Sequence, residues 1–182
     1  NIYASSDSSI HSETGTAIAL LFNHQNGNLT ISGMDVTLLA TLVAAPNSID
    51  PIAGAMIQSY GNTFIIQNSS IVVSCQILVS LFSFDGYASP IPDVYGLSLS
   101  CDGISFALTH TSLTFAGIIG VVYQEVTTPN VNTVSQNQIF GVYLRTNADE
   151  FNVTSSTLSY LGDATISAGS LFGIGIDGEG SQ

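Results

Sequence analysis

Few side chains in this sequence have the chemistry of a catalytic or metal-binding site. Arg145 is the only Lys or Arg among the 182 residues, and it stands beside a Thr-Asn-Ala-Asp-Glu segment, where a salt bridge across a turn is a more ordinary role than a catalytic base. His11, His24 and His110 occupy unlike places in the repeat described below, so they are not expected to converge on one metal ion or nucleophile. Neither a Gly-x-Ser-x-Gly elbow nor a Gly-rich phosphate loop occurs. We predict no catalytic residue and no metal ligand.

The composition restricts the classes of partner. Thirteen Asp and Glu residues against one Arg give a formal net charge of −12. Nucleic acids need Lys and Arg to displace counterions from phosphates, and anionic membrane surfaces attract the same residues. The chain is 45% hydrophobic and 8% charged, which is too apolar for a disordered protein. Its longest apolar run, SSIVVSCQILVSLFSF, is interrupted by polar residues and is shorter than the roughly 20 residues of a membrane span. We therefore predict one folded domain that neither binds nucleic acid nor spans a membrane.

A twenty-residue pattern recurs along the chain without a gap. GLSLSCDGISFALTHTSLTF begins at Gly96, and GVYLRTNADEFNVTSSTLSY begins at Gly141, 45 residues later. Each has apolar residues one and three places after the Gly, Phe at place ten, and apolar residues at places twelve, seventeen and nineteen. Further copies begin at Ala19 and Gly54, and a half-copy begins at Gly173. All length variation falls between copies, in segments rich in Pro, Asn and Asp, as expected of loops.

Apolar residues within a copy are two places apart, which indicates strands. Three short strands per copy describe one three-sided rung, and stacked rungs give an all-β, parallel β-helix (β-solenoid) of four to five rungs with variable loops at one corner. A β-sandwich also has short strands and frequent turns, but it gives no reason for a register that recurs four times. The predicted inward columns are Leu29/Phe64/Phe106/Phe151, Val36/Ile71/Leu113/Leu158 and Leu38/Val73/Phe115/Tyr160.

The rungs should form one unit over residues 1–182, at about 3–28, 29–63, 64–105, 106–150 and 151–182. The first copy begins inside a rung and the last stops before its next strand. Such ends leave unpaired backbone groups. We expect the chain to be a segment of a longer protein, or to pair its ends with other copies.

The pattern Gly-apolar-x-apolar, Phe-x-apolar, Ser/Thr-apolar-x-apolar resembles the pectate-lyase-like parallel β-helix superfamily. Within it, the pattern is most similar to large repetitive cell-surface proteins of microbes and protists, including adhesins. Enzymes of this superfamily would be polysaccharide lyases or glycoside hydrolases, which use acidic residues around Ca²⁺ with a basic proton acceptor, or clustered carboxylates. Here Arg145 is the only candidate base, and no copy has two carboxylates at adjacent outward places of one strand.

Two weaker patterns concern a cation and a disulfide. Stacked rungs would align the side chains at place six of the copies along one edge. Their oxygens make Ca²⁺ the one possible cofactor, although solvated turns explain these residues equally well. Cys75 and Cys101 share a rung and would both point inward, either as a disulfide or as two buried thiols. The residues at place six are Gln25, Tyr60, Asp102, Asn147 and Glu179.

Three N-glycosylation sequons begin at Asn28, Asn68 and Asn152. Period two turns Asn152 outward, and the other two fall at turns, so all three could carry glycans near one face. We predict a non-enzymatic, extracellular, structural or adhesive β-solenoid in a surface coat or filament. Its partners would be further copies, neighbouring solenoid segments, glycans or cell-surface proteins. The alternative is a carbohydrate-active β-helix or a glycan-binding module. Ice binding is disfavoured because the outward places lack a regular Thr-rich face.

Overall fold

The computed structural model describes residues 2–12, 17–44, 50–84, 87–88, 92–125, 138–166 and 170–178. Every regular element in these ranges is a β-strand, so the described part contains no helix that could cross a membrane. The strands are β1 (Ile2–Ser12), β2 (Ala17–His24), β3 (Asn28–Ser32), β4 (Asp35–Ala44), β5 (Ile52–Ser59), β6 (Thr63–Gln67), β7 (Ser70–Phe84), β8 (Tyr87–Ala88), β9 (Val94–Cys101), β10 (Ser105–Thr109), β11 (Ser112–Phe115), β12 (Ile118–Glu125), β13 (Gln138–Thr146), β14 (Glu150–Thr154), β15 (Thr157–Tyr160), β16 (Asp163–Ile166) and β17 (Ser170–Gly178).

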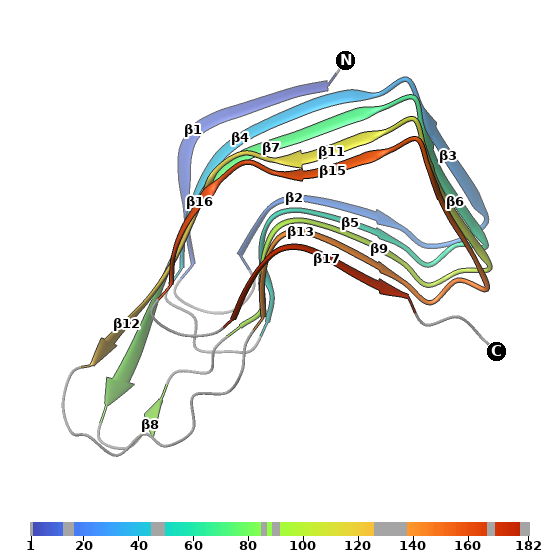
Figure 1. Cartoon of the computed structure of the whole chain (residues 1–182). Helices are drawn as coiled ribbons and strands as arrows, with labels where there is room; N and C mark the ends of the chain where they lie inside the picture. Colours follow the sequence, from blue (N-terminus) through green and yellow to red (C-terminus); the bar gives the residue numbers. More distant parts are fainter. Residues whose placement is uncertain are drawn as a thin grey trace.

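These strands form three sheets. Sheet A has the order β1-β4-β7-β11-β15 and continues past a bend through β12 and β16; sheet B has the order β2-β5-β9-β13-β17, and sheet C the order β3-β6-β10-β14. Among the described strands, all pairings between successive copies are parallel, and only the short β8 is antiparallel to its neighbour. Within each copy the chain passes from sheet B to sheet C to sheet A, so β5, β6 and β7 occupy sheets B, C and A (Figure 1). The predicted all-β chain of parallel strands is confirmed.

The strand register follows the repeated pattern. Phe106 in β10 pairs with Phe64 on one side and Phe151 on the other, and Leu29 pairs with Phe64. The columns through Ile71 and Val73 in β7 are likewise in register with their counterparts in β4, β11 and β15. Like side chains therefore stack on like, and the rings of Phe106 lie 5.8 Å from Phe64 and 5.6 Å from Phe151.

One apolar core lies between the sheets. Along β6 the burial alternates, and Phe64 and Ile66 are fully buried between half-buried neighbours. Phe106 is 1% exposed, whereas Phe151 in the same column is 41% exposed because β14 is the last described strand of sheet C. The interior of the stack is therefore dry, and apolar side chains emerge at its ends.

Sheet A extends further than three short strands per copy would require. After Val73, β7 passes through the bend and continues to Phe84, and beyond the bend Ile77, Val79 and Leu81 are buried. Buried apolar residues continue to alternate with exposed or half-buried ones after the bend, so burial of one face extends the strand beyond it. The structure thus adds to each predicted trio of strands a continuation that β12 and β16 share.

The turn from sheet C to sheet A is built the same way in four successive copies. Gly33, Asn68, His110 and Ser155 occupy this turn with positive φ angles of 63°, 49°, 48° and 49°. The amides of Asn68 and His110 donate to the carbonyls of Thr109 and Thr154 in the next copy, each at 3.0 Å. Each turn is therefore tied to the one stacked on it.

The residue after the turn carries a hydroxyl in three of the copies. Thr111 Oγ1 donates to the carbonyl of Thr109 at 3.0 Å, and Ser156 Oγ donates to that of Thr154 at 2.9 Å. Ser156 Oγ also accepts the amide of Thr111 at 3.1 Å. These buried or half-buried hydroxyls satisfy backbone groups that the turn removes from the strand ladders.

Candidate functional site

A furrow follows β9 on the face of sheet B that points away from the core. Leu97 and Leu99 face the core and are fully buried, so the alternating Ser98 and Ser100 face outward. Serine is smaller than the side chains in register on either side, which form two walls. We call this the β9 furrow; it has a volume of about 200 Å³ and is lined by Pro51, Met56, Gln58, Asp93, Tyr95, Ser98, Ser100, Tyr143 and Arg145.

Stacked aromatic rings form one wall and one end of the β9 furrow. Tyr143 lies 5.3 Å from Tyr95 and 4.5 Å from Phe140, measured between ring centroids, with interplanar angles of 23° and 28°. Phe140 also stacks on Phe172 of β17 at 5.1 Å. A Cβ on Gly175 would lie 2.3 Å from Phe140 Cε1, so this glycine leaves the room that the ring occupies. The cluster therefore spans three strands.

Two carboxylates hold the two tyrosines. Tyr95 Oη donates to Asp93 Oδ2 at 3.4 Å, and the other oxygen of Asp93 accepts the amide of Gln138 at 3.2 Å. Tyr143 Oη donates to Asp177 Oδ2 at 3.3 Å. Both phenol rings are thereby fixed in orientation, as a binding surface requires.

Burial raises the pKa of Tyr95 above its usual value, and the negative charge of Asp93 raises it further, whereas Arg145 lowers it. Burial likewise raises the pKa of Tyr143, with Asp177 adding to the shift and Arg145 opposing it. The phenols therefore stay protonated at neutral pH and act as hydrogen-bonding groups, not as bases.

Arg145 lies on the same outward face, in register with Ser100 of β9 and Asp177 of β17. It is exposed, and the only Lys or Arg of the chain thus stands at the rim of an aromatic-lined furrow. Arg145 is the penultimate residue of β13, next to the turn that the sequence predicts there. Aromatic rings, hydroxyls, one amide, one carboxylate and one guanidinium together suit a small polar organic ligand.

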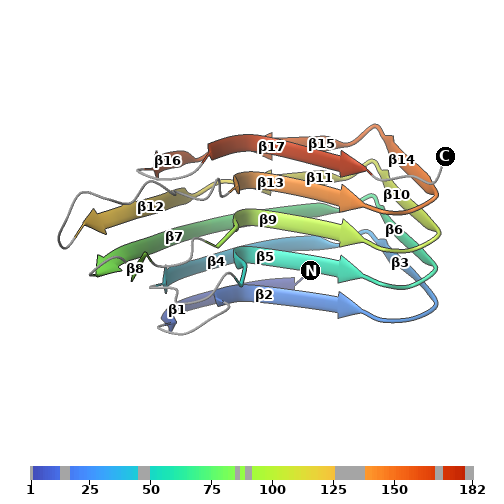
Figure 2. The same ribbon diagram turned by 90° about the horizontal axis from the view of Figure 1, so that it is seen from below.

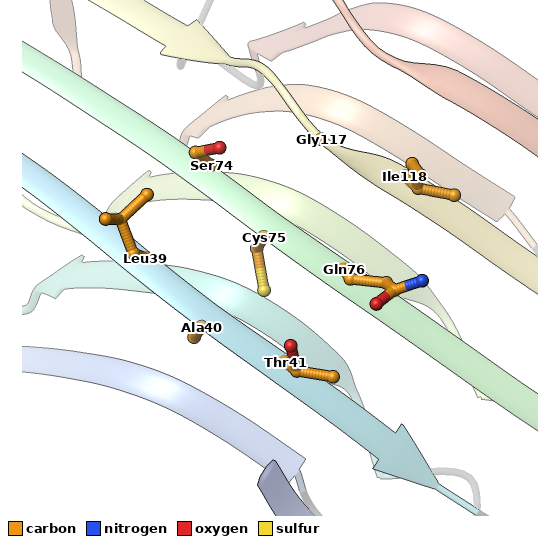
Figure 3. Close-up of a pocket in the computed structure, with 8 residues that line it drawn as sticks. All are labelled: Leu39, Ala40, Thr41, Ser74, Cys75, Gln76, Gly117 and Ile118. Atoms are coloured by element: carbon orange, nitrogen blue, oxygen red, sulfur yellow. The ribbon is translucent and has the colours of Figure 1, made fainter. Parts of the chain in front are cut away.

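A larger depression lies at the bend of sheet A (Figure 3). It measures about 480 Å³ and is lined by Leu39, Ala40, Thr41, Ser74, Cys75, Gln76, Gly117 and Ile118. A Cβ on Gly117 would lie 2.0 Å from the carbonyl oxygen of Cys75, so the bend brings these two backbones into contact. No charged or aromatic side chain lines this depression, and it carries less chemistry than the β9 furrow.

The two cysteines are free and buried. Cys75 belongs to β7 in sheet A and Cys101 to β9 in sheet B, so the structure contains two buried thiols in place of the disulfide considered above. Burial raises the pKa of the Cys75 thiol to about 12 and also raises that of Cys101. Neither thiol is a nucleophile at neutral pH.

The histidines and acids do not assemble a metal site in the described residues, where no three His, Cys, Asp or Glu side chains form a suitable group. His24 Nδ1 lies 3.0 Å from Ser59 Oγ, and His110 occupies the turn after β10. At the predicted acidic edge, Asn147 Nδ2 donates to Asp102 Oδ1 at 2.6 Å. Glu179 lies outside the described residues, as does the side chain of His11.

The three sequon asparagines are exposed. Asn28 lies in β3 and Asn152 in β14, the two edge strands of sheet C, and Asn68 follows β6 of the same sheet. All three acceptors therefore lie on or beside one sheet. Glycosylation itself stays a prediction.

Compared with protein-family models, curated proteins and solved structures, the chain matches none. Its site must be interpreted from its own residues. The sequence pattern did hold one signal for the aromatic cluster: Tyr95, Phe140 and Phe172 each stand directly before the glycine that begins a copy. Asp93 and Asp177 carry no comparable signal.

Proposed function

We propose that this chain forms a parallel β-helix that acts as a non-enzymatic structural and adhesive element at the cell surface. The observation that carries the proposal is the strand order, in which the chain passes from sheet B to C to A and returns one strand further along each sheet. Figure 2 shows the result for sheet B, with five strands stacked from β2 to β17. A ladder of this kind gives length and resistance to proteolysis with little sequence constraint on its exterior.

The exterior supports a role outside the cell. A charge of −12 keeps an apolar protein soluble, and three exposed sequons on or beside sheet C could carry glycans without disturbing the core. Immunogold electron microscopy with antibodies to this chain would test the location. We expect labelling of intact, unpermeabilised cells, and a fall in mass of the native protein on treatment with peptide N-glycosidase. Labelling confined to the cytoplasm would contradict the proposal.

A second candidate, a glycan-binding module, is favoured by the β9 furrow. Sugars present apolar C–H faces that pack on aromatic rings and hydroxyls that exchange hydrogen bonds with side chains. Tyr143 offers a ring, Ser100 a hydroxyl, and Arg145 a set of five donors. The volume of about 200 Å³ is small for a ligand pocket, and we expect it to hold a single sugar ring. In this role the β-helix presents a sugar-binding surface and cleaves nothing.

Binding of the purified chain to an array of neutral and acidic glycans tests this candidate. We expect Tyr143→Ala to reduce binding at least fivefold, since truncating an aromatic side chain that contributes to binding costs about 1 kcal/mol or more. Tyr60→Ala is the matched control, because Tyr60 is 45% exposed and lies outside the furrow. Equal binding by both variants would exclude the furrow, and cleavage of any glycan would instead favour an enzyme.

A further inference from the structure

We propose that the two ends of the strand stack bind each other, so that copies of this chain join head to tail with β2 of one copy paired in register on β17 of the next. This inference rests on the proposed β-helix and names its partner as a second copy of the chain. It concerns the ends of the stack and is independent of the β9 furrow as a sugar site.

Exposed apolar side chains gather on both edge strands of sheet B. On β2, Leu21 and Phe22 are 53% and 40% exposed, although β2 is one of the more apolar strands. On β17, at the opposite end of the stack in Figure 2, four large apolar side chains are 43–57% exposed: Leu171, Phe172, Ile174 and Ile176. Edges with this composition favour strand addition.

The register within sheet B specifies how a second copy would fit. Leu20 stands in the column that runs through Ala55, Leu97 and Val142 to Ile174. The next column begins at Phe22 and ends at Ile176. All five strands are parallel, so β2 of a second copy has the direction that β17 needs in its next neighbour. The added strand would place Leu20 on Ile174 and Phe22 on Ile176, continuing both columns.

The two ends are also complementary in shape. At the β2 end, a cavity of about 140 Å³ has an almost wholly apolar lining, formed by Leu20, Leu21, Phe22, Ile31, Met34, Val36, Ile57 and Ile71. At the β17 end, Ile176 is 57% exposed. Docking would cover the cavity with the side chains that protrude from the other end, removing both apolar surfaces from water. A contact between two different surfaces repeats from copy to copy, and because the strands of each copy stack along one axis the repeated contact gives a filament in place of a closed ring.

In sheet A, as in sheet B, the second copy must be displaced along the stack by five strand spacings. Each has five strands along the stack, and β1 of the second copy would meet β15 when β2 meets β17. Sheet C has four strands, so β14 and β3 of the next copy are separated by a slot one strand wide, and no strands collide. Phe151 and Val153, which are 41% and 38% exposed, border this slot. Two sheets thus form a continuous ladder, and the third leaves space.

Cysteine cross-linking tests the proposed register. Asn23 and Asp177 end the same outward column of sheet B and are separated by four strand spacings, about 19 Å, so a disulfide between them cannot form within one copy. In the head-to-tail contact they are adjacent. We expect the double variant Asn23→Cys/Asp177→Cys to give a series of covalent oligomers on oxidation, removed by reductant. Cys75 and Cys101 are buried and should not take part.

Two controls make the outcome decisive. Each single variant should stop at a dimer, and the offset pair Leu21→Cys/Asp177→Cys should cross-link at least tenfold less.

Association itself can be tested without cysteines. Because each copy carries a charge of −12, association should increase with salt concentration. Ile176→Lys should abolish it, whereas Val122→Lys, at a 42% exposed position away from both ends, should not.

The proposal is overturned if the double variant yields only monomers or dimers, or if the offset pair cross-links equally well. It is equally overturned if analytical ultracentrifugation of the unmodified chain shows monomers at every salt concentration. If the chain stays monomeric but keeps the hydrogen bonds between successive repeats within it, only this inference is overturned. Loss of those bonds would overturn the β-helix as well.

Discussion

Gly96 in β9 lies directly beneath the ring of Phe115 in β11: a Cβ on Gly96 would stand 2.4 Å from Cδ2 of that ring. Gly141 and Tyr160 repeat the relationship in the next copy, where the distance would be 2.1 Å. The glycine that begins a copy therefore makes room for the aromatic residue that ends it. The first glycine and the last aromatic residue of the sequence pattern thus contact each other, and this contact packs sheet B against sheet A.

Replacing this glycine should force the two sheets apart. We expect Gly96→Ala to lower the free energy of unfolding by about 1–3 kcal/mol, the usual cost of overpacking a core. Gly178→Ala is the control, since its Cβ would lie 3.8 Å from Thr146 Cγ2, an ordinary contact. Urea unfolding followed by circular dichroism measures both. Equal stability of the two variants would show that the ring does not rest on Gly96.

Position within a column should set the cost of removing a side chain. Phe106 is 1% exposed between two stacked rings, and Phe106→Ala should cost about 3–5 kcal/mol through lost burial and the cavity left behind. Phe151→Ala removes the same atoms from a site that is 41% exposed and should cost less than half as much. Comparable losses would mean that β14 is covered in the folded protein.

The turn from sheet C to sheet A should favour glycine. His110 has a φ of 48°, a conformation that costs a residue with a Cβ about 1–2 kcal/mol. We expect His110→Gly to raise the free energy of unfolding by up to about 1 kcal/mol, the rest being offset by the greater freedom of glycine in the unfolded chain. Thr109→Gly, one residue earlier within β10, should instead destabilise. Thermal unfolding midpoints of the two variants should move in opposite directions.

Alkaline pH should destabilise the fold. The Cys75 thiol has its pKa raised from 9.0 to about 12 in the folded chain, so the folded state retains a proton that the unfolded state releases. The stabilisation is complete below pH 9 and is lost as the pH rises from 9 toward 12. Urea midpoints at pH 7.5 and 10.5 should differ, and the difference should be smaller in Cys75→Ala. Both native thiols should react with Ellman's reagent only after unfolding.

The columns of the core could be predicted from the sequence because a gapless repeat fixes the register. Phe64, Phe106 and Phe151 are equivalent places of one pattern, and parallel pairing of equivalent strands brings such places together. The packing role of the repeated glycine could not be predicted from the sequence. It depends on how far sheet A stands from sheet B, which is a property of the folded layers.

The β9 furrow could not be predicted from motifs. Its floor exists because Ser98 and Ser100 are smaller than the residues in register with them, and that comparison needs the neighbouring strands. Asp93 reaches Tyr95 from two residues earlier, where nothing in the repeat marks it. The bend of sheet A was also missed, since the alternation of β7 gives no sign of a change in direction.

The central claim is that equivalent turns and strands of successive copies are hydrogen-bonded in parallel. The most direct test is an NMR measurement of scalar couplings across hydrogen bonds in the deuterated chain. We predict that the amide of Asn68 couples to the carbonyl of Thr109, and that of His110 to the carbonyl of Thr154, the pairs that lie 3.0 Å apart. Couplings from these amides to carbonyls in an antiparallel or shifted register would contradict the account.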